Sequence, residues 1–260
     1  MHLLASGMIR IATFTLGVML TLTFAAAQSA TPERLTPQLL SVRPHDANAF
    51  TQGLLFFGGS LFESVGLYGQ SSLREVDPLT GEVLRQVEVP DEFFAEGLTR
   101  VGDRLIQLTW REGTALVYDL ETFRRVGLFR YHGEGWGLCY DGARLYMSDG
   151  SATLTVRDPQ TFVVIGRVPV TLGGSPVPLL NELECVKGAI YANVWQTNAL
   201  VEIDKASGAV RTIVDASGLL TNAEAAQADV LNGVSYDPKQ DTFFLTGKLW
   251  PKLFEMQLPE

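Results

Sequence analysis

One short motif recurs five times along this chain: Gln52-Gly53-Leu54, Glu96-Gly97-Leu98, Trp136-Gly137-Leu138, Asn181-Glu182-Leu183 and Asn232-Gly233-Val234. The middle residues of successive copies lie 44, 40, 45 and 51 residues apart. Self-similarity with a period of about 20 to 50 residues is typical of propellers, solenoids and other repeat architectures. The spacing therefore predicts that the chain folds as an array of similar units.

Each repeat carries the signals of four short antiparallel strands. In the first four repeats, an aliphatic residue eight positions after the middle of the motif opens a second strand: Leu61, Leu105, Leu145 and Ile190. A glycine-containing turn precedes each of them, as expected for a hairpin. The third strand then ends at an aspartate: Asp77, Asp119, Asp158 and Asp204. A fourth strand follows, for example at 82–89 and 162–168, so each repeat is predicted to be a four-stranded meander.

The fifth repeat is shorter than the others. After an apolar strand at 243–246, only residues 253–256 remain for a third strand, and a fourth is lacking. An apolar segment at 39–42 precedes the first motif and belongs to no repeat. Pairing this segment with the last repeat completes five four-stranded sheets and removes the unpaired edge of an open array. We therefore predict an all-β fold, a five-bladed β-propeller closed by pairing of an N-terminal strand with the last blade.

A solenoid of the leucine-rich type is the alternative architecture. It needs shorter repeats and a helix or 3₁₀ turn in every unit. The only helix-like stretch of this chain is an insertion at 222–229, which accounts for the longest interval between motifs. A charged fraction of 19%, together with 25 glycines and 12 prolines, also disfavours a helical bundle.

The first residues carry the features of a secretory signal peptide. Arg10 precedes an apolar run at 11–24, and Ala25-Ala26-Ala27 supplies the small residues of a cleavage site. A membrane anchor is the alternative, but the run is shorter than the roughly 20 residues needed to span a bilayer. We therefore expect a signal peptide at 1–27, a single propeller domain at 28–260, and an extracytoplasmic location, periplasmic or secreted.

The charge and the cysteine count disfavour several classes of function. Asp and Glu number 29 against 20 Lys and Arg, so the formal charge of −9 argues against nucleic-acid binding. With three histidines, and with Cys139 and Cys185 as the only cysteines, a Cys/His zinc site is not expected. The sequence predicts neither a metal nor a cofactor, and it leaves open whether the two cysteines form a disulfide.

The residue before the middle of each motif should form a ring, because the innermost strands of a propeller line its central channel. The five members are Gln52, Glu96, Trp136, Asn181 and Asn232. A carboxylate, three amides and an indole at one mouth of a channel are typical of a small-molecule pocket. The other interpretation is that these side chains only solvate a water-filled channel.

Longer stretches around the motifs resemble a known family. They include Phe50-Thr51-Gln52-Gly53-Leu54, Gly66-Leu67-Tyr68-Gly69, Gly135-Trp136-Gly137-Leu138, Leu180-Asn181-Glu182-Leu183-Glu184, Asn193-Val194-Trp195-Gln196-Thr197 and Thr246-Gly247-Lys248-Leu249-Trp250. From about Pro44 to Met256, in order and across all five repeats, the chain resembles the plant and bacterial (papaya-type) glutaminyl-peptide cyclotransferases. The resemblance implies a five-bladed propeller that converts an N-terminal glutamine into pyroglutamate with release of ammonia.

The resemblance also implies an active site at one mouth of the channel, and no matching position departs from the family. The implied catalytic residues are Glu96, Gln52, Asn181 and Lys248, and the implied substrate-binding residues are Phe50, Phe94, Trp110, Trp136 and Trp195. The partners would be peptides or proteins with an N-terminal glutamine, with no nucleic acid and no membrane after signal cleavage, and the protein would be a monomer. The animal type of this enzyme is a zinc protein on another fold, and the shortage of histidine argues against it.

Glu96 is predicted to be a proton shuttle, since cyclisation moves a proton from the attacking amine to the departing ammonia. Neighbouring aromatic side chains would raise its pKa from about 4.3 toward neutrality. Gln52 and Asn181 would hold either the developing oxyanion or the substrate's α-amine and first peptide group. Lys248 would contact Glu96 or the oxyanion.

Each of these residues also has a purely structural interpretation. Glu96 could be a solvated turn residue, the amides could tie blades together, the aromatic side chains could be core wedges, and Lys248 could lie on the surface. Glu182 and Glu184 stay outside catalysis in our interpretation, as an ion-pair cluster or a cation site. Two other classes of function fit the ring: a calcium-dependent, lactonase-like propeller hydrolase, and a propeller that binds peptides without catalysis.

Overall fold

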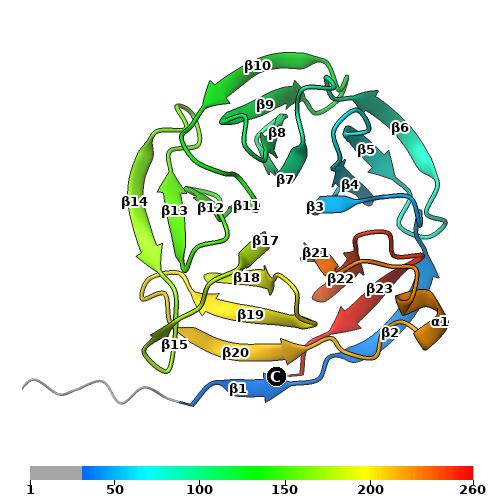
Figure 1. Ribbon diagram of the computed structural model, residues 1–260, viewed down its shortest axis with the longest axis vertical. Coiled ribbons are helices and arrows are strands. Elements are labelled where there is room, and N and C mark those ends of the chain that lie inside the picture. The colour runs from blue at the N-terminus through cyan, green and yellow to red at the C-terminus, as the bar shows by residue number, and fades with distance from the viewer. Residues whose placement is uncertain (1–30, 260) are drawn as a thin grey trace, which may run out of the picture.

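Five antiparallel sheets stand around a common axis as the blades of a propeller (Figure 1). This computed structural model describes residues 31–259, so the expected signal peptide at 1–27 lies outside the described residues. The prediction of an all-β, five-bladed propeller is confirmed. In every blade the strand that carries or follows the recurrent motif is the innermost one.

The blades follow one another around the ring in chain order. Blade 1 contains β3 (Thr51–Phe57), β4 (Ser60–Val65), β5 (Ser72–Val76) and β6 (Val83–Glu88). Blade 2 contains β7 (Ala95–Val101), β8 (Arg104–Thr109), β9 (Thr114–Asp119) and β10 (Arg125–Arg130), and blade 3 contains β11 (Leu138–Tyr140), β12 (Leu145–Met147), β13 (Thr153–Arg157) and β14 (Val164–Pro169). Blade 4 contains β17 (Leu180–Val186), β18 (Ala189–Val194), β19 (Ala199–Asp204) and β20 (Val210–Asp215). Blade 5 contains β21 (Leu231–Asp237), β22 (Thr242–Gly247), β23 (Lys252–Gln257) and, outermost, β2 (Gln38–Pro44).

Two N-terminal strands cover the outer edges of blades 4 and 5. β2 runs antiparallel to β23, with Leu39 opposite Met256 and Val42 opposite Phe254. Ahead of it, β1 (Glu33–Leu35) runs parallel to β20 and adds a fifth strand to blade 4. We did not predict β1 from the sequence, because three residues are too few to show the alternation of a strand. The N-terminal segment thus spans the seam between two blades.

Each seam between neighbouring blades has its own apolar cluster. Leu73 of blade 1 and Leu116 of blade 2 are fully buried in one of them, and Leu154 of blade 3 and Ile190 of blade 4 in another. The same arrangement recurs between blades 2 and 3, 4 and 5, and 5 and 1. The core therefore lies between the sheets, which leaves the axis free for polar side chains.

Glycine occupies the middle of the motif because the innermost strands approach too closely for a side chain. A Cβ atom at Gly53 would lie 2.5 Å from the backbone nitrogen of Leu98, and one at Gly137 would lie 2.1 Å from the backbone oxygen of Asn181. Both distances are far below van der Waals contact. Substituting either glycine would therefore push neighbouring blades apart.

Glu182 takes this position in blade 4, and its side chain reaches blades 5 and 1. Its carboxyl group is fully buried and accepts hydrogen bonds from the backbone N–H groups of Val234 in blade 5 (2.9 Å) and Leu54 in blade 1 (3.4 Å). Burial raises its pKa well above the ordinary value for glutamate. Among residues 31–259 neither Glu182 nor Glu184 forms an ion pair with a basic side chain, so the ion-pair interpretation is wrong, whereas the alternative of a cation site stays a prediction. Glu182 instead joins three blades through backbone amides.

The aspartates that end the third strands build one repeated turn. The Oδ1 atom of Asp77 accepts the backbone N–H groups of Leu79 (2.7 Å) and Thr80 (3.1 Å), and Asp204 does the same two and three residues ahead. Such Asx turns satisfy backbone donors that a tight turn would otherwise leave unpaired. They explain why the same residue type recurs at this place.

The insertion before blade 5 is less helical than we predicted. Helix α1 covers Asn222–Ala225 rather than 222–229. Thr221 and Glu224 form a capping box at its start, but none of its residues is buried. Without an apolar face to pack, the helix ends after about one turn. A small hairpin of β15 (Thr171–Leu172) and β16 (Ser175–Pro176) links blades 3 and 4.

A disulfide joins blades 3 and 4. Cys139 on β11 and Cys185 on β17 are bonded, with their Cα atoms 5.5 Å apart. The sequence had left this pairing open. Disulfides persist mainly in oxidising compartments. In the part of the chain that is described, no helix is long and apolar enough to cross a membrane.

Candidate active site

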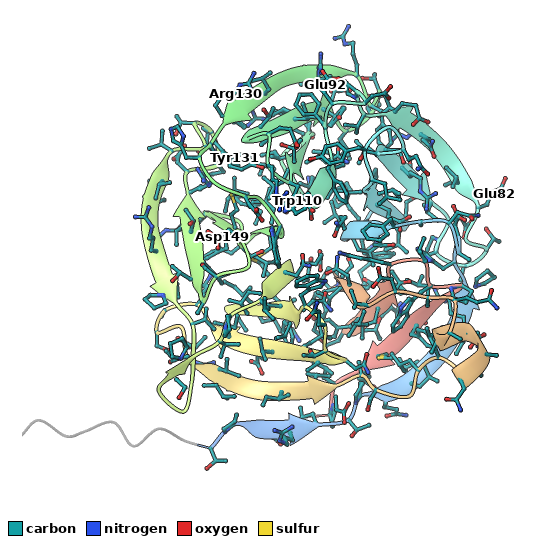
Figure 2. All side chains as sticks on the ribbon, in the orientation of Figure 1. Glu82, Glu92, Trp110, Arg130, Tyr131 and Asp149 are labelled. Atoms are coloured by element: carbon teal, nitrogen blue, oxygen red, sulfur yellow. A yellow bond between two sulfur atoms is a disulfide. The ribbon has the colours of Figure 1, made fainter. Side chains whose placement is uncertain are left out.

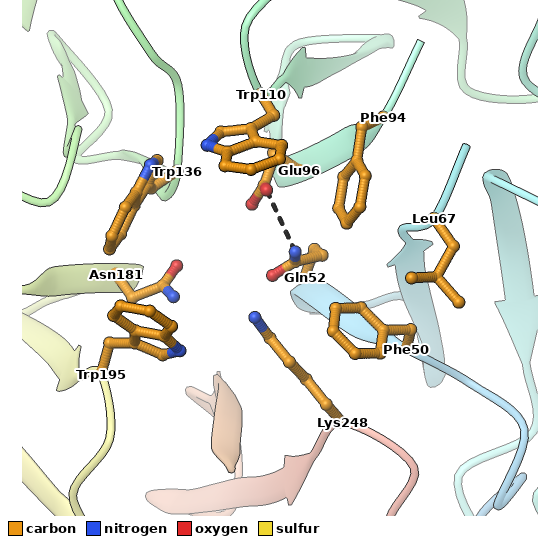
Figure 3. A pocket seen from close by; sticks show the side chains of 10 residues that line it. All are labelled: Phe50, Gln52, Leu67, Phe94, Glu96, Trp110, Trp136, Asn181, Trp195 and Lys248. Atoms are coloured by element: carbon orange, nitrogen blue, oxygen red, sulfur yellow. Dashed lines mark hydrogen bonds between the residues drawn. The ribbon is translucent and has the colours of Figure 1, made fainter. Parts of the chain in front are cut away.

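A cavity of about 280 Å³ lies at the centre of the ring (Figure 3). It is lined by Phe50, Gln52, Leu67, Phe94, Glu96, Trp110, Trp136, Asn181, Trp195 and Lys248. All nine residues that the sequence analysis assigned to a site therefore meet in one place, although they span about 200 positions of the chain. Leu67 is the one lining residue that the analysis did not select.

Two positions in each blade supply most of the lining. The first is the ring position at or just before the start of the innermost strand, which provides Gln52, Glu96, Trp136 and Asn181. The second directly follows the second strand of the same hairpin, and it provides Trp110 and, in blades 4 and 5, Trp195 and Lys248. Strand pairing places the two positions side by side, because Ala95 pairs with Thr109 and Leu180 pairs with Val194.

Glycine takes the second position in blade 1, where space is short. A Cβ atom at Gly66 would lie 2.5 Å from the ring of Phe94 and 2.9 Å from Cγ of Gln52. The missing side chain therefore lets both groups reach the cavity. Leu67, which follows, has a φ of 91° and presents its side chain to the cavity wall.

Glu96 is the end of a short chain of hydrogen bonds that runs from Asn232 through Gln52. Only 5% of the residue is exposed, and its Oε1 atom accepts a hydrogen bond of 3.0 Å from Nε2 of Gln52. Oε1 of Gln52 accepts in turn from Nδ2 of Asn232 at 3.3 Å. Asn232, the fifth member of the predicted ring, therefore does not line the cavity but orients the amide of Gln52.

The charged side chains around the cavity shift the pKa of Glu96 in opposite directions. Burial raises the pKa of its carboxyl group well above the ordinary value, and the carboxylates of Glu134 and Glu112 raise it further, while Lys248 lowers it. The ammonium group of Lys248 points into the cavity (Figure 3), and burial lowers its pKa. Among the described residues these two groups do not form an ion pair, although both line the cavity.

Aromatic rings wall the cavity on two sides. Trp136 and Trp195 meet edge to face at 5.5 Å between ring centroids, and Phe94 and Trp110 do so at the same separation. Phe50 lies 6.2 Å from Phe94 and 4.8 Å from Nζ of Lys248. These contacts fix the orientation of the rings and keep bulk water away from Glu96.

Comparison with known proteins identifies the family. A family model described as "Glutamine cyclotransferase" matches residues 12–258. The chain belongs to the glutamine cyclotransferase family. A glutaminyl-peptide cyclotransferase from Arabidopsis thaliana is 43% identical over 223 residues, which cover 84% of this chain and 69% of that protein. The crystal structure of Myxococcus xanthus glutaminyl cyclase matches with a TM-score of 0.81 and 44% identity, over 87% of this chain and 98% of that one.

Glu134 is a residue of this glutamine cyclotransferase site that the sequence analysis missed. Its Oε2 atom accepts hydrogen bonds from the indole nitrogens of both Trp110 (2.8 Å) and Trp136 (3.0 Å). Its Oε1 atom accepts from Nε of Arg111 at 3.1 Å. One carboxylate thus connects two walls of the cavity. It lies two residues before the ring position, in the stretch Gly133-Glu134-Gly135-Trp136, and the repeat alignment compared only equivalent positions.

Glu112 has a related position but different contacts. Its Oε1 atom accepts a hydrogen bond of 2.7 Å from the hydroxyl group of Tyr68, which lies edge-on to Phe94. Among the hydrogen bonds of residues 31–259, none joins Glu112 to a tryptophan; its Oε2 atom accepts from the backbone N–H of Phe94 at 3.5 Å. Within residues 31–259, no group of three or more His, Cys, Asp and Glu side chains is arranged to hold a metal ion.

Proposed function

We propose that this cavity converts the N-terminal glutamine of peptides and proteins into pyroglutamate, with Glu96 as the proton shuttle. The glutamine cyclotransferase family and the names of the relatives support the reaction. The observation that carries the mechanism is a buried carboxyl group, hydrogen-bonded to an amide and surrounded by aromatic rings, at the centre of the ring.

The reaction needs no nucleophile from the protein. The substrate's α-amine attacks its own γ-carboxamide carbon, a C–N bond forms, and a tetrahedral intermediate results. Glu96 accepts a proton from the attacking nitrogen and returns it to the nitrogen of the leaving group, so ammonia departs and the carboxylate is regenerated. A raised pKa suits this exchange, because an efficient shuttle titrates near the working pH.

Polar groups on both sides of Glu96 can orient the substrate. The Oδ1 atom of Asn181 is buried and finds no hydrogen-bond donor among the described residues. Buried acceptors are rarely left unpaired, so we assign it to the α-amine or the first peptide N–H of the substrate. Lys248 points into the cavity across from Glu96 (Figure 3), so we assign it to the oxyanion of the intermediate.

Incubation with a short peptide that begins with glutamine tests this proposal. Mass spectrometry should show the loss of one ammonia, whereas a peptide that begins with asparagine should stay intact, because its shorter side chain would have to close a strained four-membered ring. Turnover should persist with a chelator present; turnover that stops would favour a calcium-dependent hydrolase. Binding without conversion would favour a peptide-binding propeller.

Infrared difference spectroscopy should detect the raised pKa of Glu96. The carbonyl stretch of its protonated form, assigned by its absence in Glu96→Gln, is expected to persist well above the ordinary glutamate pKa of about 4.3. Because the charge of Lys248 lowers this pKa, Lys248→Met should extend the signal to still higher pH. Turnover should fall as the pH drops below the raised pKa of Glu96, since a protonated Glu96 cannot accept the proton of the attacking amine. If the signal of protonated Glu96 in the wild type disappeared at the ordinary glutamate pKa of about 4.3, the proposal would be contradicted.

Replacing Glu134 with glutamine should lower kcat/KM by about 10- to 100-fold, because the oxygen that accepts from both indoles loses its negative charge and the two hydrogen bonds weaken. Steady-state kinetics and tryptophan fluorescence measure the effect. Glu112→Gln is the matched control, since it removes a neighbouring charge that also acts on Glu96 but leaves the indoles untouched. Equal losses in the two variants would show that Glu134 acts only through its charge.

We further propose that the mature protein works outside the cytoplasm as a monomer. The disulfide between blades 3 and 4 supports an oxidising location. Fractionation of the native host and light scattering of the purified protein test the two statements separately.

A further inference from the structure

A second cleft, of about 400 Å³, lies where blades 2 and 3 meet on the outer side of the propeller. Arg130, Arg157 and Arg167 line it together with His132 and Asp149. Figure 2 labels Arg130 at the end of β10, Tyr131 directly after it and Asp149 in blade 3 beyond β12. The cleft shares no lining residue with the active-site cavity.

Strand register brings two of these arginines onto one face of blade 3. Thr155 on β13 pairs with Arg167 on β14. Arg157 follows Thr155 by two residues, so its side chain points to the same face, because side chains alternate along a strand. After a register shift Arg157 pairs with Val164, so the two arginines are diagonal neighbours on this face, and the charge of Arg167 acts unfavourably on that of Arg157.

Arg157 is nearly buried, with 6% of the residue exposed. Its Nη1 atom donates to the backbone oxygen of Phe162 (3.0 Å) and its Nε atom donates to the sulfur of Met147 (3.1 Å). The guanidinium group also lies over the rings of Phe162 and Tyr131, at 4.7 and 5.5 Å from the centroids. Two of its five N–H donors are thus used, both on neutral atoms.

None of the three arginines forms an ion pair within the described part of the chain. Arg74, a second arginine with the same 6% exposure, shows the contrast: it binds the carboxylates of Glu63 at 2.5 Å and Asp46 at 2.8 Å. The pKa of Arg74 is raised, whereas burial and the nearby charge of Arg167 lower that of Arg157. A buried guanidinium normally needs an anionic partner. Among residues 31–259 no carboxylate forms an ion pair with Arg157, and the charge of Asp149 reaches it only from a distance.

We propose that this cleft binds a small oxyanion of the phosphate type, held by Arg157 and Arg167 with Arg130 at the rim. The forked donors of guanidinium groups match the oxygens of such an anion. Three arginines face one carboxylate here, Asp149, in a chain whose formal charge is −9. Because the protein as a whole is negatively charged, its net charge would repel anions, and binding would depend on these arginines.

Calorimetric titration with inorganic phosphate, at an ionic strength fixed with sodium chloride, tests the proposal. We expect one binding site per chain, a higher thermal midpoint with phosphate than with chloride, and at least about tenfold weaker binding in Arg167→Gln. Arg125→Gln is the matched control, because Arg125 is exposed at the other end of β10 and does not line the cleft. It should bind phosphate as the wild type does.

Arg130→Gln is a second test variant. Arg130 is exposed, so its replacement should not disturb folding, whereas replacement of the buried Arg157 could prevent it. Phosphate binding no stronger than chloride binding, or equal affinity in Arg167→Gln, Arg130→Gln and Arg125→Gln, would overturn the proposal. A parallel titration with methyl phosphate separates two sources of the anion. Tighter binding of the ester would indicate a phosphorylated small molecule, and weaker binding would indicate free phosphate.

Discussion

Glu96→Gln should fold as the wild type does and turn over about 10²- to 10⁴-fold more slowly, the range that a positioned general acid–base contributes. The amide is nearly isosteric with the carboxyl group and can still accept the hydrogen bond of 3.0 Å from Gln52. It cannot accept the proton of the attacking amine. Release of ammonia from a glutamine-initiated peptide measures kcat, and circular dichroism with thermal unfolding measures the fold.

The expected loss belongs to kcat rather than to substrate binding. The aromatic walls and Asn181 remain in place in this variant, so KM should change little. Glu88→Gln serves as a control for the substitution itself, because Glu88 is exposed on the outermost strand of blade 1. A variant that keeps more than about a tenth of the wild-type kcat would remove Glu96 from the shuttle role.

Much of the fold could be predicted because its cause is local and repeated. Close approach of the innermost strands requires glycine at one position, as at Gly53 and Gly137, and the turns require aspartate at another, as at Asp77. Each of these residues recurs in four of the five blades, so both constraints are visible as a period. β1 has no such signature, because its place beside β20 depends on how the closed ring presents an edge.

The site was only partly predictable, because some of its contacts join residues that the repeat does not relate. The ring position follows from the repeat, and the resemblance supplied the aromatic residues that the repeat alone could not assign. Glu134 acts through two indoles from different blades, so its role appears only when Trp110 and Trp136 are brought together in space. Glu182 was misinterpreted because its partners are backbone amides of distant blades, which no side-chain pattern records.

Of the substitutions considered for this protein, removal of the disulfide should lower the free energy of unfolding most. Replacement of Cys139 and Cys185 by alanine is expected to lower the free energy of unfolding by about 2–5 kcal/mol, because the bond closes a long loop in the unfolded chain. The two cysteines are 46 residues apart and join the innermost strands of two blades. Alanine is preferred to serine, because Cys139 lies in the apolar cluster between these blades, where a hydroxyl group would lack a partner.

Urea unfolding of the oxidised wild type and the Cys139→Ala/Cys185→Ala variant measures this difference. Wild-type protein kept under reducing conditions should unfold at nearly the midpoint of the variant, since both lack the same cross-link. Neither cysteine lines the active-site cavity, so kcat under native conditions should stay close to the wild-type value. Coincident midpoints for the oxidised protein and the variant would show that seam packing, rather than the cross-link, holds blades 3 and 4 together.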